Sequence, residues 1–175
     1  MKITSVILGL CCLLVINCAK ENNKVDTTEN IEKAEQSSRI TAKAIERIDY
    51  KDYALSIEAE QAIVTWEKYQ ELARQLGYLK KADFSFFNGD KVLLKTFIDE
   101  FKTQLPEDLK TSPILSRNAI VETELLKLNE NLTIDNIERS EKLESIKGLF
   151  EAVSNLNYQI NKKLERDLYD KIQPE

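Results

Sequence analysis

Apolar residues recur every three or four positions through much of this chain, which is the spacing of one face of an α-helix. The clearest stripe covers residues 59–76, and Gly77 follows it as the type of residue that often ends a helix. Another stripe covers residues 94–105 and stops at Pro106, which cannot continue a helix. The pattern therefore predicts two helices with these limits.

Two further helices are predicted in the C-terminal part. Ser112 and Pro113 are typical of an N-cap and the first helical residue, and they precede an apolar stripe over residues 114–132. Thr133 or Asp135 can cap the last helix, which runs towards Ile172. Its stripe consists of Ile146, Phe150, Val153, Leu156, Ile160, Leu164 and Leu168. A helix of this length overhangs its partners or bends.

Gly148 is the position where the last helix is expected to bend, because glycine loosens a helical backbone. The heptad-like spacing of the same helix leaves open a coiled-coil seam between two subunits. Packing within a bundle of helices also accounts for a stripe of this length, so a coiled coil is not required.

Two segments carry weaker patterns. Residues 31–48 show helical spacing with few large apolar side chains, and the polar residues 49–52 connect this helix to the next. Residues 78–90 are the longest irregular segment, with a turn at Asn88-Gly89. Four aromatic residues gather in the irregular segment: Tyr78, Phe84, Phe86 and Phe87. We expect them to fold back and close one end of the bundle; the alternative is a binding patch.

Composition supports an all-α fold. Among 175 residues only 4 are glycine and 3 are proline, fewer than β-sandwiches and barrels need for their turns. Short connections favour antiparallel neighbours. We therefore predict an up-down antiparallel bundle of four or five helices with a long C-terminal helix, occupying residues 30–175.

The N-terminus has the pattern of a targeting segment. Lys2 precedes an apolar run over residues 6–16, which is too short to span a membrane, and Cys18 follows where a cleavage site is expected. Together, Val15-Ile16-Asn17-Cys18 resembles the lipobox of bacterial lipoproteins. The resemblance implies cleavage before Cys18, acylation of that cysteine and anchoring of the chain to a membrane. An ordinary anchor or secretory signal is the alternative.

The same resemblance organises the rest of the N-terminal region. Residues 1–17 are the expected signal peptide, and residues 18–29 are a polar tether that carries the lipidated cysteine. Ala19 favours the outer membrane, because Asp at this place is the retention signal in lipoproteins. The sequence leaves open whether the body faces the periplasm or the cell surface.

The helical body is similar to small lipoproteins of Bacteroidota in the general residue pattern of Glu151–Lys162 (EAVSNLNYQINK). Helical surface lipoproteins of spirochaetes are the second resemblance. Neither resemblance implies an activity.

Candidate chemistry is sparse. The chain has no histidine, which removes the usual general base and the commonest metal ligand. It lacks an EF-hand loop, a phosphate-binding glycine loop and a nucleophile elbow. We therefore predict no catalytic residue, no metal site and no cofactor. The net charge of −5 disfavours nucleic acid as a partner.

Two classes of function remain. The first is a non-enzymatic structural or interaction protein of the cell envelope, held at the membrane by Cys18. The second is a surface-exposed lipoprotein that binds a host molecule or another ligand. An enzyme is disfavoured by the missing histidine and glycine loops. The sequence does not decide the oligomeric state.

Overall fold

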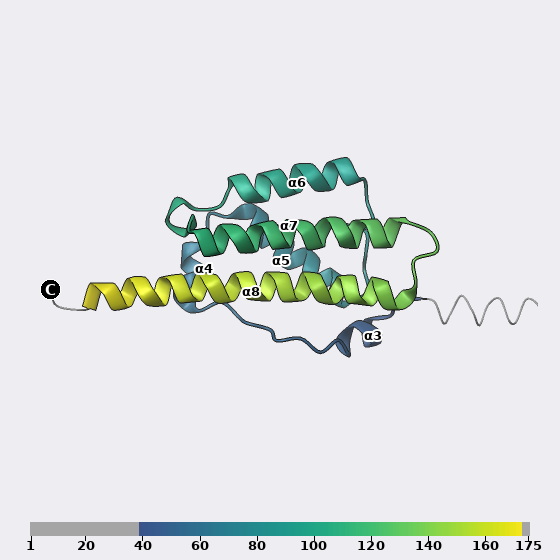
Figure 1. Ribbon diagram of the computed structural model, residues 1–175, viewed down its shortest axis with the longest axis horizontal. Coiled ribbons are helices and arrows are strands. Elements are labelled where there is room, and N and C mark those ends of the chain that lie inside the picture. Colours follow the sequence, from purple (N-terminus) through teal and green to yellow (C-terminus); the bar gives the residue numbers. More distant parts are fainter. Residues whose placement is uncertain (1–38, 173–175) are drawn as a thin grey trace, which may run out of the picture. The chain divides into compact units, whose positions relative to one another are not determined.

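The computed structural model describes residues 39–172, and every regular element within this range is a helix. The α-helices are α3 (Ala42–Glu46), α4 (Ile57–Ala62), α5 (Glu67–Lys80), α6 (Lys91–Thr103), α7 (Ser112–Thr133) and α8 (Arg139–Ile172), with the 3₁₀ turn η1 (Glu107–Leu109) after α6 (Figure 1). The prediction of an all-helical fold with a long C-terminal helix is confirmed. The predicted signal peptide (1–17), Cys18 and the tether (18–29) lie outside the described residues.

One hydrophobic core joins the helices. In α6 all five predicted positions are buried: Leu94, Phe97, Ile98, Phe101 and, just after the helix, Leu105. The two longest helices, α7 and α8, lie side by side along most of α7 (Figure 1). Their facing stripes are also buried, with Val121, Leu125 and Leu128 from α7 and Ile146, Leu156 and Ile160 from α8. The spacing of apolar residues therefore located most of the core, but Leu168, the last residue of the predicted stripe in α8, is 57% exposed.

The predicted helix over residues 59–76 is wrong in one respect, because it is broken into α4 and α5. The break follows the β-branched run Ile63-Val64-Thr65, and such side chains lose rotamer freedom in a helix. Ile63 and Trp66 turn inward at the break and are buried. The backbone N–H groups of Ile63, Val64 and Trp66 keep hydrogen bonds to preceding carbonyls, so the break brings the indole into the core without leaving these donors unpaired.

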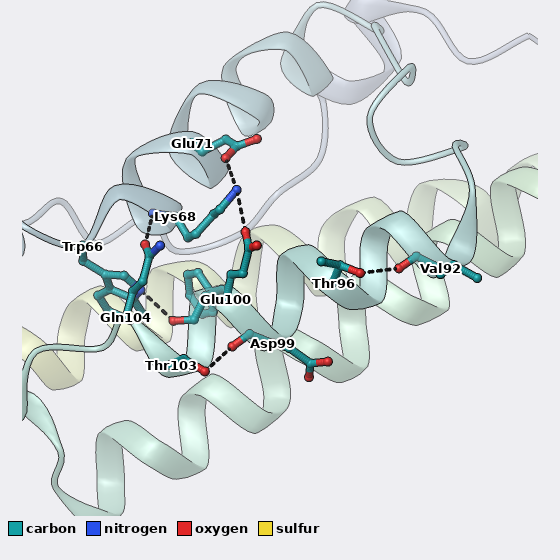
Figure 2. Close-up of polar contacts among 10 residues, drawn as sticks. Trp66, Lys68, Glu71, Val92, Thr96, Asp99, Glu100, Thr103 and Gln104 are labelled. Atoms are coloured by element: carbon teal, nitrogen blue, oxygen red, sulfur yellow. Dashed lines mark hydrogen bonds and ion pairs between the residues drawn. The ribbon is translucent and has the colours of Figure 1, made fainter.

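The side chains of Trp66, at the start of α5, and Gln104, at the end of α6, each form a hydrogen bond with a backbone group at the end of the other helix (Figure 2). The indole Nε1 of Trp66, at the N-cap of α5, donates to the carbonyl of Phe101 near the end of α6 (2.7 Å). In return the side chain of Gln104, the C-cap of α6, accepts from the backbone N–H of Lys68 (3.0 Å). Each helix end leaves backbone groups without a partner inside its own helix, so this exchange stabilises both ends.

Lys68 strengthens the same junction. Its ammonium lies 2.9 Å from Glu71 and 3.0 Å from Glu100 (Figure 2). It also lies 5.2 Å from the centre of the Phe97 ring. The two carboxylates hold the pKa of Lys68 above its ordinary value, although its partial burial acts in the opposite direction. This charged group therefore ties α5 to α6.

Gly77 does not end a helix, which corrects the second expectation for this region. It lies inside α5, which continues to Lys80. The residue that takes the left-handed conformation after the helix is Ala82, with φ of 63°. The N–H groups of Ala82 and Asp83 bond back to the carbonyls of Leu79 (2.9 Å) and Tyr78 (3.1 Å). This is a Schellman motif in which alanine takes the place usually held by glycine.

The starts of α7 and α8 also differ from the prediction. The N-cap of α7 is Thr111 rather than Ser112, so Pro113 is one residue further inside the helix. Thr133 belongs to α7, where its hydroxyl donates to the carbonyl of Asn129 (2.8 Å), and α8 begins at Arg139. The connection turns at Asn136, whose φ of 66° suits the αL conformation that asparagine tolerates.

Helix α8 is continuous through Gly148, the predicted bend. Its 34 residues correspond to a length of about 51 Å at the usual rise per residue. The C-terminal end extends beyond α7 (Figure 1), and the side chains of Leu168, Tyr169 and Ile172 are exposed there. Of the predicted alternatives, the overhang is therefore the one observed.

Three of the four aromatic residues predicted to close one end of the bundle, Phe84, Phe86 and Phe87, pack inward. The fourth, Tyr78, lies within α5 and is 49% exposed, so the prediction is wrong for this residue. Phe87 is completely buried, and Phe86 contacts both Phe87 and Phe97 edge-on with ring centres 5.0 Å apart. The buried amide of Asn129 in α7 donates to the carbonyls of Phe87 (2.8 Å) and Gly89 (3.0 Å). These bonds fix the turn, and Asp90 then caps α6 through the N–H of Val92 (2.7 Å).

The predicted helix over residues 31–48 is present only as the short α3 among the described residues; positions 31–38 lie outside them. Ile45 is its one buried residue. From Arg47 the chain is not helical as far as α4, so residues 49–52, which could have joined the two helices with or without a break, lie in a break.

Candidate functional site

A non-helical segment, residues 47–56, runs along α8 between α3 and α4 (Figure 1). We call it the strap. An extended backbone exposes polar groups that need partners, and buried ones are almost always paired. In the strap these partners are side chains of α8, which lies about a hundred positions later in the sequence.

Three polar residues of α8 form the attachment: Ser154, Asn157 and Asn161. The hydroxyl of Ser154 accepts from the N–H of Tyr53 (2.7 Å) and donates to the carbonyl of Lys51 (2.6 Å). The amide of Asn157 donates to the carbonyl of Tyr53 (3.0 Å). Asn161 accepts from the N–H of Ser56 (2.9 Å) and donates to the carbonyl of Ala54 (2.8 Å). Their spacing of three and four residues places them on one face of α8.

Asn157 also joins this attachment to α5. Its carbonyl oxygen accepts a short hydrogen bond from the hydroxyl of Tyr69 (2.6 Å). Burial raises the pKa of Tyr69 well above its ordinary value, while the bond to Asn157 acts in the opposite direction. The phenol therefore remains protonated at physiological pH and serves as a structural donor.

Two hollows open where the strap meets α3, α5 and α8, and we call them together the strap groove. The larger has a volume of about 410 Å³ and is lined by Ala42, Ile45, Glu46, Ile48, Tyr50, Lys80 and Phe150. The smaller has about 200 Å³ and is lined by Tyr50, Asp52, Tyr69, Ala73, Leu76, Gly77, Lys80, Phe150, Val153, Ser154 and Asn157. Both hollows share Tyr50, Lys80 and Phe150, so these three side chains form the centre of the groove.

The centre combines two aromatic rings with one cation. The rings of Tyr50 and Phe150 stack with their centres 5.2 Å apart. The ammonium of Lys80 lies 5.9 Å from the centre of the Tyr50 ring and 5.6 Å from that of Phe150. At these distances a cation is attracted by the faces of the rings.

Asp52 completes the centre. It accepts a hydrogen bond from the hydroxyl of Tyr50 (3.0 Å), and the ammonium of Lys80 lies 3.4 Å from the same carboxylate oxygen. Burial acts to lower the pKa of Lys80, but its contacts with Tyr50 and Asp52 outweigh it, so the pKa lies above the ordinary value. Burial is also the main reason that the pKa of Tyr50 is raised. Both groups are therefore protonated near neutral pH.

These groups suit binding rather than proton transfer, because neither titrates near neutral pH. Within residues 39–172, no group of three or more histidine, cysteine or acidic residues could hold a metal ion. Cys18, the site residue predicted from the sequence, lies outside the described part of the chain. The strap groove, where two hollows share a stacked aromatic pair and a cation, is thus the candidate binding site.

No pattern in the sequence predicted this groove. Its residues come from three separate stretches of the chain, and Lys80 and Tyr50 look like ordinary surface residues by pattern. One signal was present: Ser154, Asn157 and Asn161 form a polar stripe at helical spacing within Glu151–Lys162. That stretch had suggested a family resemblance, and in the structure it binds the strap.

Comparison with known proteins gives no relative: no protein-family profile, no curated protein and no solved structure matches this chain. In the part of the chain that the structure describes, none of the helices combines the length and apolar character needed to cross a bilayer. The site must therefore be interpreted from its own residues.

Proposed function

We propose that this protein is a lipid-anchored, non-enzymatic binding protein of the cell envelope. Cys18 carries the anchor, the residues after it form a tether, and the helical body binds a ligand or partner. The outer membrane is the proposed location, because Ala19 rather than Asp follows the cysteine. The body needs no cofactor or metal for this role.

The strap groove is the observation that supports binding. Pockets for small molecules are mostly apolar hollows of several hundred Å³ with a few well-placed polar groups. The larger hollow has this size, an aromatic and aliphatic lining, and one lysine at its centre.

The anchor is tested by cell fractionation. Full-length protein and the variant Cys18→Ala are expressed and separated by detergent phase partition. Wild-type protein is expected in the detergent phase, whereas Cys18→Ala should be an unacylated precursor that no longer enters it as the wild type does. The matched control is Cys12→Ala, which changes a cysteine within the signal peptide and should behave as wild type. Equal partition of Cys18→Ala and wild type would refute the anchor.

The exposed end of α8 supports a second candidate function, an interaction with a protein partner. Leu168, Tyr169 and Ile172 are 57%, 60% and 70% exposed, and they lie close together on the overhanging turns. Exposed apolar side chains in a cluster mark interaction surfaces more often than isolated ones do. Protease treatment of whole cells would show whether this end faces the outside.

We also propose that the helices are arranged as an up-down antiparallel bundle. Residues near the end of α7 meet residues near the start of α8: Asn131 bonds to Ser145 (2.5 Å), and Glu124 lies against Gly148. This pairing supports an antiparallel order for α7 and α8, and disulfide trapping across other helix pairs would test the rest.

A further inference from the structure

Lys80 has an unusual position in the strap groove. Among the described residues that line the two hollows, it is the one cation, and both hollows open beside its ammonium. Its side chain is 51% exposed and its contact with Asp52 is long at 3.4 Å, so this ion pair contributes little stability. An ammonium has three N–H donors, which leaves capacity for an additional acceptor.

Gly77 is the second feature that the fold itself does not require. Glycine in the interior of a helix is unfavourable relative to alanine. A Cβ atom at Gly77 would meet no atom within 4 Å beyond its own helix, so close packing does not explain the glycine. Gly77 lines the smaller hollow together with Ala73, one turn earlier. The absence of side-chain bulk on this face of α5 keeps the hollow open.

We propose that the strap groove binds a small monocarboxylate with an aryl or unbranched alkyl body. The carboxylate pairs with Lys80, and the apolar body lies against Tyr50 and Phe150. The open face at Gly77 accommodates the part of the ligand that enters the smaller hollow. This inference rests on the proposed function, because it names the ligand class of the same site.

The charges of the lining explain this choice. A carboxylate can pair with the ammonium of Lys80, which already lies over the aromatic rings. An amine at the same place would be repelled by this ammonium and would have to displace it. Asp52 is retained by the hydroxyl of Tyr50 at 3.0 Å, so Lys80 can turn towards a ligand without leaving Asp52 unbonded. Glu46 and Asp52 also line the groove. Lys80 is the one cation among the described residues of this lining, so a second acidic group on the ligand would find no partner and would be repelled by both carboxylates, which favours a monoanion over a dianion.

The test compares two probes with the same skeleton and opposite charge, 4-phenylbutyrate and 4-phenylbutylamine. Each is measured by equilibrium dialysis against the full-length protein in detergent. The carboxylate should bind and the amine should not. Lys80→Gln should weaken carboxylate binding by about tenfold or more, since a charged hydrogen bond is lost. The control Lys81→Gln removes a neighbouring exposed charge and should change binding by less than about twofold.

Gly77→Leu provides an independent variant. Leucine favours helix more than glycine does, so the unfolding midpoint should not fall, yet the side chain should block the smaller hollow and weaken binding of 4-phenylbutyrate. Preferred binding of the amine, equal effects of the two lysine variants, or no binding of either probe would overturn the proposal. These outcomes are separate from the fractionation of Cys18→Ala, which tests the anchor and not the ligand.

Discussion

Two helix-interior glycines offer a matched experiment on packing. Gly77→Ala and Gly148→Ala make the same chemical change in α5 and α8, and both positions have helical backbone. The added methyl should stabilise each helix by about 1 kcal/mol if nothing obstructs it. At Gly77 the space is open. At Gly148 the new Cβ would lie 2.4 Å from Oε2 of Glu124, which is too short for a non-bonded contact between carbon and oxygen.

Glu124 must therefore move when Gly148 becomes alanine. Its Oε2 atom is buried without a hydrogen bond among the described residues, and its nearest cation, Lys127, is 3.8 Å away. Forcing a side chain out of its rotamer costs about 0.5–1.5 kcal/mol, which offsets most of the gain from helix propensity. We expect Gly77→Ala to raise the free energy of unfolding by about 1 kcal/mol and Gly148→Ala to leave it nearly unchanged.

Urea unfolding followed by far-ultraviolet circular dichroism measures both effects. Glu124→Ala and the double variant Glu124→Ala/Gly148→Ala complete a mutant cycle, in which the alanine at position 148 should recover its full benefit. The coupling energy should be about 1 kcal/mol, within the range for residues in contact. A coupling below about 0.3 kcal/mol, which is within the additivity of independent sites, would show that Glu124 does not restrict position 148.

Three further substitutions test the packing and the caps by the same unfolding measurement. Ala82→Gly should stabilise the protein by about 1 kcal/mol because it relieves an alanine held in the left-handed conformation; a loss of stability would contradict the Schellman assignment. Phe87→Ala should lower the free energy of unfolding by about 3–5 kcal/mol, the usual loss for a buried ring. An unchanged midpoint would favour the alternative that this segment is a binding patch. Asn118→Leu should stabilise the fold by about 1–3 kcal/mol, because both polar atoms of its buried side chain lack a hydrogen bond within the described residues; destabilisation would mean that the amide is satisfied.

The predicted end of the helix at Gly77 shows the limit of local signals. Glycine is common after a helix, but it ends one only where the chain must take a left-handed turn. Here that turn falls at Ala82, because the inward packing of Phe87 and its bonds to Asn129 fix where the chain leaves α5. The residue type suggested an end, and the packing of the next segment decided its place.

The helical class and the buried stripes were determined by the sequence alone, because both follow from the repeat of apolar residues along a single helix. The stripe of α6, from Leu94 to Leu105, was predicted residue by residue. The break at Trp66 was not, since its indole is held by the carbonyl of Phe101 in another helix.

The candidate site depended on tertiary structure throughout. The strap is held by Ser154, Asn157 and Asn161, more than a hundred positions away for each bond. Its hollows form only when Tyr50 and Lys80 are brought together on Phe150. Periodicity reports which face of a helix is buried, but it holds no information about which distant segment lies against that face. The sequence therefore determined the helical class and most of the inner faces, while the pairing of those faces created the groove.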